Sequence, residues 1–206
     1  MEKQAGSSVS FFAPNRLEAL TDGVFAIAMT LMVLGLDLPG LPGKNTEAEL
    51  SSALRDLALP LFKYAISFLL LGTFWVIHIR QAHHVRRVDV VYLWLGMGAL
   101  LLITLVPFST SLVGDYPDMS PAEIFFHLNI LGISTLYAAQ WSHATRHHRL
   151  VEPDLPTGMI EKERRLGLLI PAFAIMGLML AAEGPFESNL LYAAVPVLAA
   201  LLRRYS

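Results

Sequence analysis

The feature that most constrains this chain is a series of apolar stretches, each close to the ~20 residues that a helix needs to cross a membrane. Six spans are predicted, over residues 17–38, 57–80, 90–113, 121–143, 166–182 and 189–202, and the last is short for a full crossing. The stretches lack the alternation of barrel strands, and only helices and closed barrels satisfy the backbone in lipid. We therefore predict an all-α integral membrane protein, with one six-helix membrane domain over residues 1–206.

Composition excludes several classes of function. Only 16% of the 206 residues are charged, against about 25% in soluble domains. The chain has no cysteine, so it has neither a disulfide framework nor a thiolate nucleophile. No glycine-rich phosphate loop and no nucleophile paired with a base is recognisable. We expect no enzyme activity and no catalytic residue, no cofactor or metal, and no nucleic-acid partner.

Lysine and arginine predict the orientation. With the N-terminus inside, the outer segments hold only Lys44, Arg55 and Lys63 of the 15 basic residues, which leaves twelve for the inner side. Cytoplasmic loops carry such an excess. The first ten residues are polar and do not resemble a signal peptide, so the first helix is expected to stay in the mature protein. We predict a multi-pass protein of the cell membrane with both termini cytoplasmic.

Ionisable residues inside membrane spans cost free energy, so their presence suggests a function. Arg16 opens the first span, and Asp22 lies six residues later, ~9 Å deeper at 1.5 Å per residue. His78 lies near the inner end of the second span, one turn from Trp75, so all these residues share the cytoplasmic half. One interpretation is a polar clamp that fixes helix packing. The other is a role in proton transfer or gating.

The first span also carries a periodic apolar stripe. Ile27, Thr30, Leu31 and Leu34 lie at spacings of 3, 4 and 7, so they share one helix face. Small residues in the same span allow close helix approach: Gly23, Ala26 and Ala28. If several copies surrounded an axis, this face would form stacked apolar rings and a ring of hydroxyls. The alternative is an ordinary face that contacts lipid or another helix.

Residues 16–34 resemble the signature of the transmembrane-protein-175 family of potassium channels. That family opens its first helix with Arg-x-x-x-Phe-Ser-Asp, followed in bacterial members by a stretch like Gly-Val-Phe-Ala-Ile-Ala-Ile-Thr-Leu. Here Arg16 and Asp22 match, Leu20 and Thr21 are mild departures, and residues 23–31 read Gly-Val-Phe-Ala-Ile-Ala-Met-Thr-Leu. Two further segments look similar to the family: Trp75 to His78, like Trp-x-x-His, and Pro107-Phe108-Ser109-Thr110.

The resemblance implies a homotetramer whose pore is lined by the first helix of each subunit. It assigns the apolar constriction to Ile27, Leu31 and Leu34, and a part in ion selectivity to Thr30. It also implies a polar network behind the pore helix: Arg16, Asp22, Trp75 and His78. Like the family, this chain lacks the Thr-Val-Gly-Tyr-Gly carbonyl filter. Only modest selectivity for K⁺ over Na⁺ is therefore expected.

One segment departs from the family. Many relatives follow the stripe with Glu-Ile-Lys, whereas Gly35-Leu36-Asp37 stands here. Gly35 removes an acidic side chain near the outer mouth, and Asp37 restores one two residues later. We expect a ring of Asp37 carboxylates to concentrate cations at that mouth.

The prediction is therefore a homotetrameric, potassium-permeable channel in the lipid bilayer, with monovalent cations as its permeant partners. One alternative is a proton- or cation-coupled transporter that uses Asp22 and His78 as a relay. Another is an intramembrane enzyme, for which only the cluster of His143, His147 and His148 offers candidate groups. A metal pair or a pH sensor in that cluster is a weaker reading than solvated histidines at the interface. The last alternative is a structural subunit of another assembly.

Overall fold

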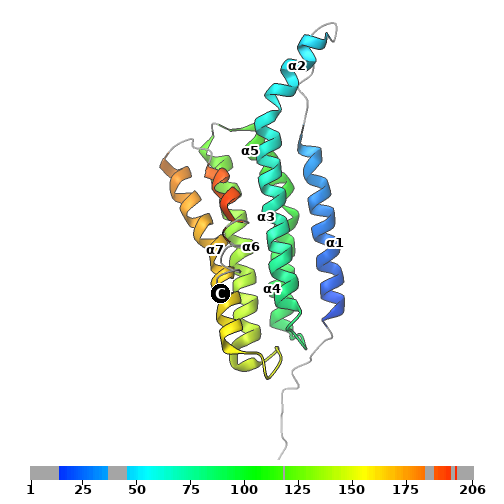
Figure 1. The fold of residues 1–206 in the computed structure, drawn as a ribbon, viewed down its shortest axis with the longest axis vertical. Helices are drawn as coiled ribbons and strands as arrows, with labels where there is room; N and C mark the ends of the chain where they lie inside the picture. The colour runs from blue at the N-terminus through cyan, green and yellow to red at the C-terminus, as the bar shows by residue number, and fades with distance from the viewer. Residues whose placement is uncertain (1–13, 37–45, 118, 184–187, 196–197, 199–206) are drawn as a thin grey trace, which may run out of the picture.

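The computed structural model describes residues 14–36, 46–117, 119–183, 188–195 and 198, and these residues form a bundle of long helices (Figure 1). Along the chain lie α1 (Asn15–Leu31), η1 (Met32–Gly35), α2 (Glu47–Asp56), α3 (Ala58–Ala82), α4 (Val90–Thr104), α5 (Val106–Asp115), α6 (Ser120–Thr145), η2 (Arg146–His148), α7 (Thr157–Glu183) and η3 (Ser188–Ala193).

Within the described part of the chain, five helical segments are long and apolar enough to cross a membrane. They run from Asn15 to Gly35, Ala58 to Ala82, Val90 to Asp115, Ser120 to His148 and Thr157 to Glu183. The predicted all-α membrane fold is confirmed. The predicted sixth span, over residues 189–202, is described only over residues 189–195 and at 198, and η3 covers its beginning.

The third segment is broken near Pro107, a residue inside the span predicted over residues 90–113. Helix α4 ends at Thr104 and α5 begins at Val106, with Pro107 in the first turn of α5. Proline has no N–H to donate to the preceding turn, so the helical ladder is interrupted there. At the break, the N–H of Leu105 donates to the carbonyl of Leu102 over 3.1 Å, which tightens the turn.

Helix α2 stands beyond the rest of the bundle (Figure 1). The sequence analysis did not anticipate this helix. Its start is a capping box: the Thr46 side chain accepts from the N–H of Glu49 over 3.3 Å, and the Glu49 carboxylate accepts from the N–H of Thr46 over 2.9 Å. The pattern Thr-x-x-Glu is a known signal for a helix start. This signal does not depend on hydropathy, and the apolar stretches from which the helices were predicted include only the membrane spans.

Helix α7 begins at Thr157, well before the predicted start at residue 166. The additional turns contain charged residues, so an apolar window does not include them. Ile160 and Glu163 in these turns are nevertheless buried. The Glu163 carboxylate accepts from Arg80 at the end of α3 over 2.6 Å. This part of α7 is therefore a polar extension of the membrane helix that packs against the bundle.

Helix α6 lies at the centre of the packing, in contact with α7, α4 and α5. Ile130 and Ile133 of α6 are essentially inaccessible, as are Ile103 of α4 and Ala174 of α7. Lipid is as apolar as these side chains, so close packing and interhelical hydrogen bonds stabilise such contacts. Helix α1 lies at one edge of the bundle and α7 at the other (Figure 1).

Two loops join each other at one end of the bundle. Val85, after α3, forms an isolated antiparallel bridge with Val151, after η2. The N–H of Arg86 donates to the carbonyl of Leu150 over 2.9 Å, and the Arg86 side chain pairs with Glu152. We call residues 83–89 and 146–156 the loop clasp.

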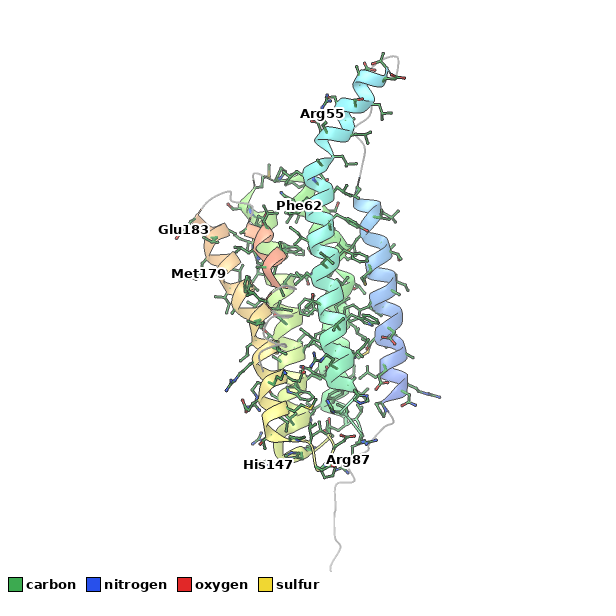
Figure 2. All side chains as sticks on the ribbon, in the orientation of Figure 1. Arg55, Phe62, Arg87, His147, Met179 and Glu183 are labelled. Atoms are coloured by element: carbon green, nitrogen blue, oxygen red, sulfur yellow. The ribbon has the colours of Figure 1, made fainter. Side chains whose placement is uncertain are left out.

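Basic residues collect at the end of the bundle that holds the loop clasp. Figure 2 labels Arg87 and His147 at this end, and Arg55 at the opposite end with α2. Of the 11 described lysines and arginines, only Arg55 and Lys63 lie toward the α2 end, which leaves nine at the clasp end. We call the clasp end the basic end.

Candidate functional site

Helix α1 buries one face against its own chain. Leu17, Thr21, Phe25, Ala28 and Met32 are buried, at spacings of three and four residues. Such spacing places them on one side of the helix. This side packs against α3 and α4.

The opposite face of α1 carries the predicted constriction residues. Ile27 is 60% exposed, Leu31 45% and Leu34 71%. Thr30, between them, is exposed as well. The stripe that the sequence predicted is therefore left uncovered by the described residues of its own chain.

The hydroxyl of Thr30 is oriented by its own helix. Its Oγ1 donates to the carbonyl of Ala26 at 3.0 Å or of Ile27 at 2.9 Å. A hydroxyl that donates its proton to the backbone keeps its lone pairs for other partners. Thr30 thus presents an oxygen acceptor within the apolar stripe.

Small residues lie on both sides of α1. Gly23 and Ala26 are exposed, and a Cβ on Gly23 would meet nothing within 4 Å. Ala28 is buried at 1% exposure. Gly23 and Ala26 therefore leave room for an external helix, whereas Ala28 permits close packing within the chain.

Asp22 and Trp75 link α1 to α3. The indole N–H of Trp75 donates to Oδ1 of Asp22 over 2.9 Å. Asp22 is exposed in the single chain, so this contact lies at the border between the buried and exposed faces of α1. Of the predicted polar network, this pair is joined directly.

His78 lies close to this pair and is 5% exposed. Its ring stacks obliquely on Tyr137 of α6, with 5.3 Å between centroids and an interplanar angle of 43°. Among the described residues, its Nε2 has no hydrogen-bond partner. A cavity of about 240 Å³ is lined by His78, Asp22 and Glu18, together with residues of α3 and the clasp.

Arg16 does not join the predicted network in the single chain. Its side chain is exposed, and within the described ranges no ion pair connects it to Asp22. Asp22 takes its hydrogen bond from Trp75 instead.

The segment after the stripe packs against another helix of its own chain. A Cβ on Gly35 would lie 3.2 Å from Cβ of Ser111 in α5. The side of η1 that holds Gly35 therefore packs against α5, and a glutamate there would start from a crowded position. Asp37, the predicted outer-mouth residue, lies outside the described residues.

The histidines in the last turn of α6 and in η2 have separate partners. Nε2 of His143 lies 2.9 Å from Oδ2 of Asp89, whereas Nε2 of His148 lies 3.1 Å from the carbonyl of Leu155. His147 adopts a positive φ of 54°. In the described part of the chain, no group of three or more histidine or acidic side chains is placed to hold a metal ion.

Asp89 is the centre of the loop clasp. It is 2% exposed and caps α4 by accepting from the N–H of Tyr92 over 2.9 Å. Arg149 also approaches it, at 3.2 Å. Burial alone would raise the pKa of this carboxyl, but Tyr92, His143 and Arg149 together hold the pKa below its ordinary value.

A second buried polar cluster was not predicted from the sequence. His127 of α6 contacts Tyr192 OH through Nδ1 at 3.0 Å and Ser188 Oγ through Nε2 at 2.7 Å. Ser188 also donates to Glu123 over 3.1 Å. All of these side chains are buried. The only sequence signal was an ionisable pair in one span, Glu123 and His127, four residues apart.

Comparisons with known proteins converge on one family. A family model described as the endosomal/lysosomal potassium channel TMEM175 matches residues 16–107. A potassium channel of Streptomyces collinus is 32% identical over 182 residues, which cover 82% of this chain and 87% of that protein. A potassium channel of Chamaesiphon minutus is 34% identical over 169 residues, which cover 78% of this chain and 82% of that protein.

The fold has a counterpart of known structure. The crystal structure of a lysosomal potassium-selective channel TMEM175 homolog from Chamaesiphon minutus matches with a TM-score of 0.71. The match is 24% identical in sequence and covers 93% of this chain and 96% of that chain. This likeness supports the helical arrangement described above.

Proposed function

This chain belongs to the TMEM175 channel family, and from that premise we propose that it is a potassium-permeable cation channel whose pore is lined by α1. The observation that carries the proposal is the uncovered stripe of Ile27, Thr30, Leu31 and Leu34. Its relatives are named as channels, and no enzyme activity is proposed.

The composition of the stripe fits a pore axis between subunits better than a surface in contact with lipid. Its apolar side chains could face either lipid or a pore axis, but Thr30 presents its oxygen acceptor on the same exposed face. An oxygen acceptor has no partner in hydrocarbon, whereas it can coordinate a cation in a pore. One copy of α1 cannot enclose a pore, so an oligomer is required. The family resemblance makes that oligomer a homotetramer.

In this arrangement Ile27 forms the tightest apolar ring, with Leu31 and Leu34 as further rings. Apolar rings of this kind gate by dewetting and hold ions weakly. Thr30 hydroxyls assist a partly dehydrated K⁺ between those rings. Selectivity for K⁺ over Na⁺ is modest, because side-chain hydroxyls form a sparser coordination shell than stacked backbone carbonyls.

The polar residues behind the stripe fix the distance of α1 from the pore axis. The hydrogen bond between Trp75 and Asp22 ties α1 to α3. His78 packs behind it on Tyr137. Arg16, exposed at the start of α1, is free to reach a neighbouring subunit and complete the network there.

The basic end of the bundle is placed on the cytoplasmic side, by the positive-inside rule. The α2 end then faces outward in the cell membrane. Asp37 follows the stripe by three residues and contributes a carboxylate ring at the outer mouth. With the predicted sixth span over residues 189–202 crossing the membrane, both termini are cytoplasmic in this orientation.

A second candidate function is a proton- or cation-coupled transporter with an Asp22–His78 relay. One observation favours it. Both residues line the cavity of about 240 Å³, and Nε2 of His78 has no hydrogen-bond partner in the described part of the chain. In a carrier, flux of one ion depends on a gradient of another, whereas a channel passes K⁺ down its own gradient alone.

The test is cation flux into liposomes that contain the purified protein, with a K⁺ gradient and then a Na⁺ gradient, each with and without a pH gradient. We expect K⁺ flux to exceed Na⁺ flux and to be independent of the pH gradient. Ile27→Asn should raise the flux or weaken the selectivity, because a polar ring stays wet. Leu101→Asn on α4, where the side chain is 65% exposed, is the matched control and should change neither.

Two outcomes would contradict the proposal. Flux that requires a pH gradient and disappears in Asp22→Asn would favour the transporter. Unchanged currents in Ile27→Asn, from protein that is folded and oligomeric, would remove Ile27 from the pore.

A further inference from the structure

The cavity of about 240 Å³ lies at the basic end of the bundle, where α1 begins and α3 ends (Figure 1). Helix α1 contributes Glu18 and Asp22, which are four residues apart and therefore share one helix face. The rest of the described lining comes from α3 and the residue after it: His78, Ile79, Ala82 and His83. Two helices that are distant in the sequence thus build this cavity together.

The two carboxylates of the cavity are not neutralised within the described part of the chain. Nine described lysines and arginines lie at this end of the bundle, but none of them lines the cavity. The described ion pairs use other carboxylates. Glu18 is half-buried without such a pair, and Asp22 accepts only from the neutral indole of Trp75. The cavity therefore keeps an excess of negative charge.

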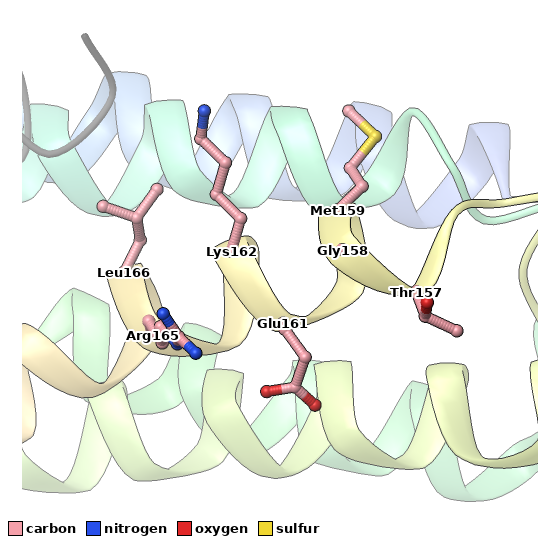
Figure 3. A pocket seen from close by; sticks show the side chains of 7 residues that line it. All are labelled: Thr157, Gly158, Met159, Glu161, Lys162, Arg165 and Leu166. Atoms are coloured by element: carbon pink, nitrogen blue, oxygen red, sulfur yellow. The ribbon is translucent and has the colours of Figure 1, made fainter. Parts of the chain in front are cut away.

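The cavity beside the first turns of α7, at the same end, has a different lining. Its described lining residues all belong to α7, and they include the cationic side chains Lys162 and Arg165 (Figure 3). Of these two cavities, the one between α1 and α3 is lined by two helices and carries carboxylates without a lysine or arginine. It is the one that can enclose a cation.

His78 adds a buried nitrogen to the carboxylates. Its side chain is 5% exposed, and its Nε2 finds no hydrogen-bond partner among the described residues. The ring is held by Tyr137, with 5.3 Å between centroids. A buried polar atom without a partner costs free energy, so a ligand with N–H donors in the cavity would remove that cost. In the tautomer protonated at Nδ1, Nε2 accepts such a hydrogen bond.

The lining fits an organic cation better than a metal ion. A metal ion requires its ligand atoms within about 2.0–2.6 Å, and no group of three or more histidine or acidic side chains in the described ranges is placed in that way. An ammonium group reaches separate acceptors through its three N–H donors. Glu18 and Asp22 lie about 6 Å apart along the helix axis at 1.5 Å per residue. The two ammonium groups of a short diamine can therefore pair with one carboxylate each.

We propose that this cavity binds a short aliphatic diamine of the putrescine class. One ammonium group pairs with Asp22 and donates to Nε2 of His78, and the other ammonium group pairs with Glu18. The methylenes between them lie against Ile79 and Ala82. Binding does not require conduction along α1, so the diamine site is independent of the proposed channel function.

The test is isothermal titration calorimetry of the full chain in detergent with putrescine, n-butylamine or tetramethylammonium. We expect saturable binding of putrescine, and about tenfold weaker binding of n-butylamine, which lacks the second ammonium group. Tetramethylammonium should not bind measurably, because it has no N–H donor. Putrescine should also raise the midpoint of thermal unfolding, since it binds the folded chain. Equal affinity for tetramethylammonium and putrescine would overturn the assignment.

Three variants locate the site. Glu18→Gln removes one carboxylate charge and should weaken putrescine binding about tenfold. His78→Phe keeps a ring against Tyr137 but loses the nitrogen, and should weaken binding about fivefold. Asp154→Asn, at an exposed carboxylate of the loop clasp, removes the same charge as Glu18→Gln. It is the matched control and should leave the affinity within about twofold.

Two results from these variants would overturn the site. Equal loss of affinity in Glu18→Gln and Asp154→Asn would indicate diffuse attraction to surface charge. Unchanged affinity in both Glu18→Gln and His78→Phe would place putrescine elsewhere on the chain. Thermal unfolding without ligand checks that each variant is folded.

Discussion

The indole N–H of Trp75 donates to the carboxylate of Asp22 over 2.9 Å and joins the proposed pore helix α1 to α3. A hydrogen bond to a charged acceptor is stronger than a neutral one, although the exposure of Asp22 in the single chain moderates its contribution. We predict that Trp75→Phe, which keeps the aromatic ring but loses the donor, destabilises the chain by about 1 kcal/mol. Thermal unfolding in detergent measures this. Trp94→Phe, at a residue 72% exposed, is the control, and equal stability of both variants would contradict a structural role for the bond.

Thr30→Val should weaken the preference for K⁺ over Na⁺ and leave stability almost unchanged. Valine keeps the β-branched shape but removes the oxygen that Thr30 presents from the stripe. Thr73 of α3 bonds back to the carbonyl of Leu69 over 2.8 Å in the same manner, so Thr73→Val is a matched control with no effect on selectivity. The measurement is the ratio of K⁺ to Na⁺ flux in liposomes. A loss of selectivity in both variants would point to helix distortion rather than to ion contact.

Gly177 of α7 provides the space that His127 occupies. A Cβ there would lie 2.2 Å from Cε1 of the buried His127 ring, so Gly177→Ala must displace the ring from Ser188 and Tyr192. We predict a destabilisation of about 1–3 kcal/mol, as for overpacked cores. Gly158→Ala in the first turn of the same helix, where a Cβ meets nothing within 4 Å, should instead change the stability by no more than about 0.5 kcal/mol. Thermal unfolding of the two variants compares them, and similar midpoints would contradict the packing described here.

Asp89 makes the stability of the loop clasp depend on pH. Its pKa is lowered in the folded chain, so its contribution is complete above the ordinary carboxyl pKa of about 3.9 and is lost as pH falls through the folded pKa. Asp89→Asn keeps a side-chain oxygen for the α4 cap but loses the charge, and should cost about 1–3 kcal/mol at neutral pH. Asp89→Ala loses the cap too and should cost about 1 kcal/mol more. Unfolding followed from pH 7 to pH 3 should show a smaller acid loss in Asp89→Asn than in the wild type. Parallel pH curves would contradict this.

The sequence predicted features that depend on local periodicity. Five of the six predicted apolar spans, and the common face of Ile27, Leu31 and Leu34, follow from hydropathy and from helical spacing. Such features require only residues that are close in the chain. They could therefore be derived without knowing how the helices pack.

Features that depend on contacts between distant segments could not be derived in this way. His127 meets Tyr192 across 65 residues of sequence, and Asp89 meets His143 across 54. The resemblance implied a network of Asp22 with Arg16, Trp75 and His78, but only the packing of α1 on α3 identifies Trp75 as the donor to Asp22. The Thr46 capping box, in contrast, was readable in the sequence as Thr-x-x-Glu.

The central claim is that the exposed stripe of α1 lines an aqueous ion path. The chain contains no cysteine, so single cysteines can be introduced without any background. In liposomes with a K⁺ gradient, a cationic methanethiosulfonate reagent should reduce flux by more than half in Ile27→Cys and Leu34→Cys. It should not affect Met179→Cys, at an exposed residue of α7. Full flux in the treated Ile27→Cys and Leu34→Cys proteins, whose thiols react normally in detergent, would contradict the claim that α1 lines the pore.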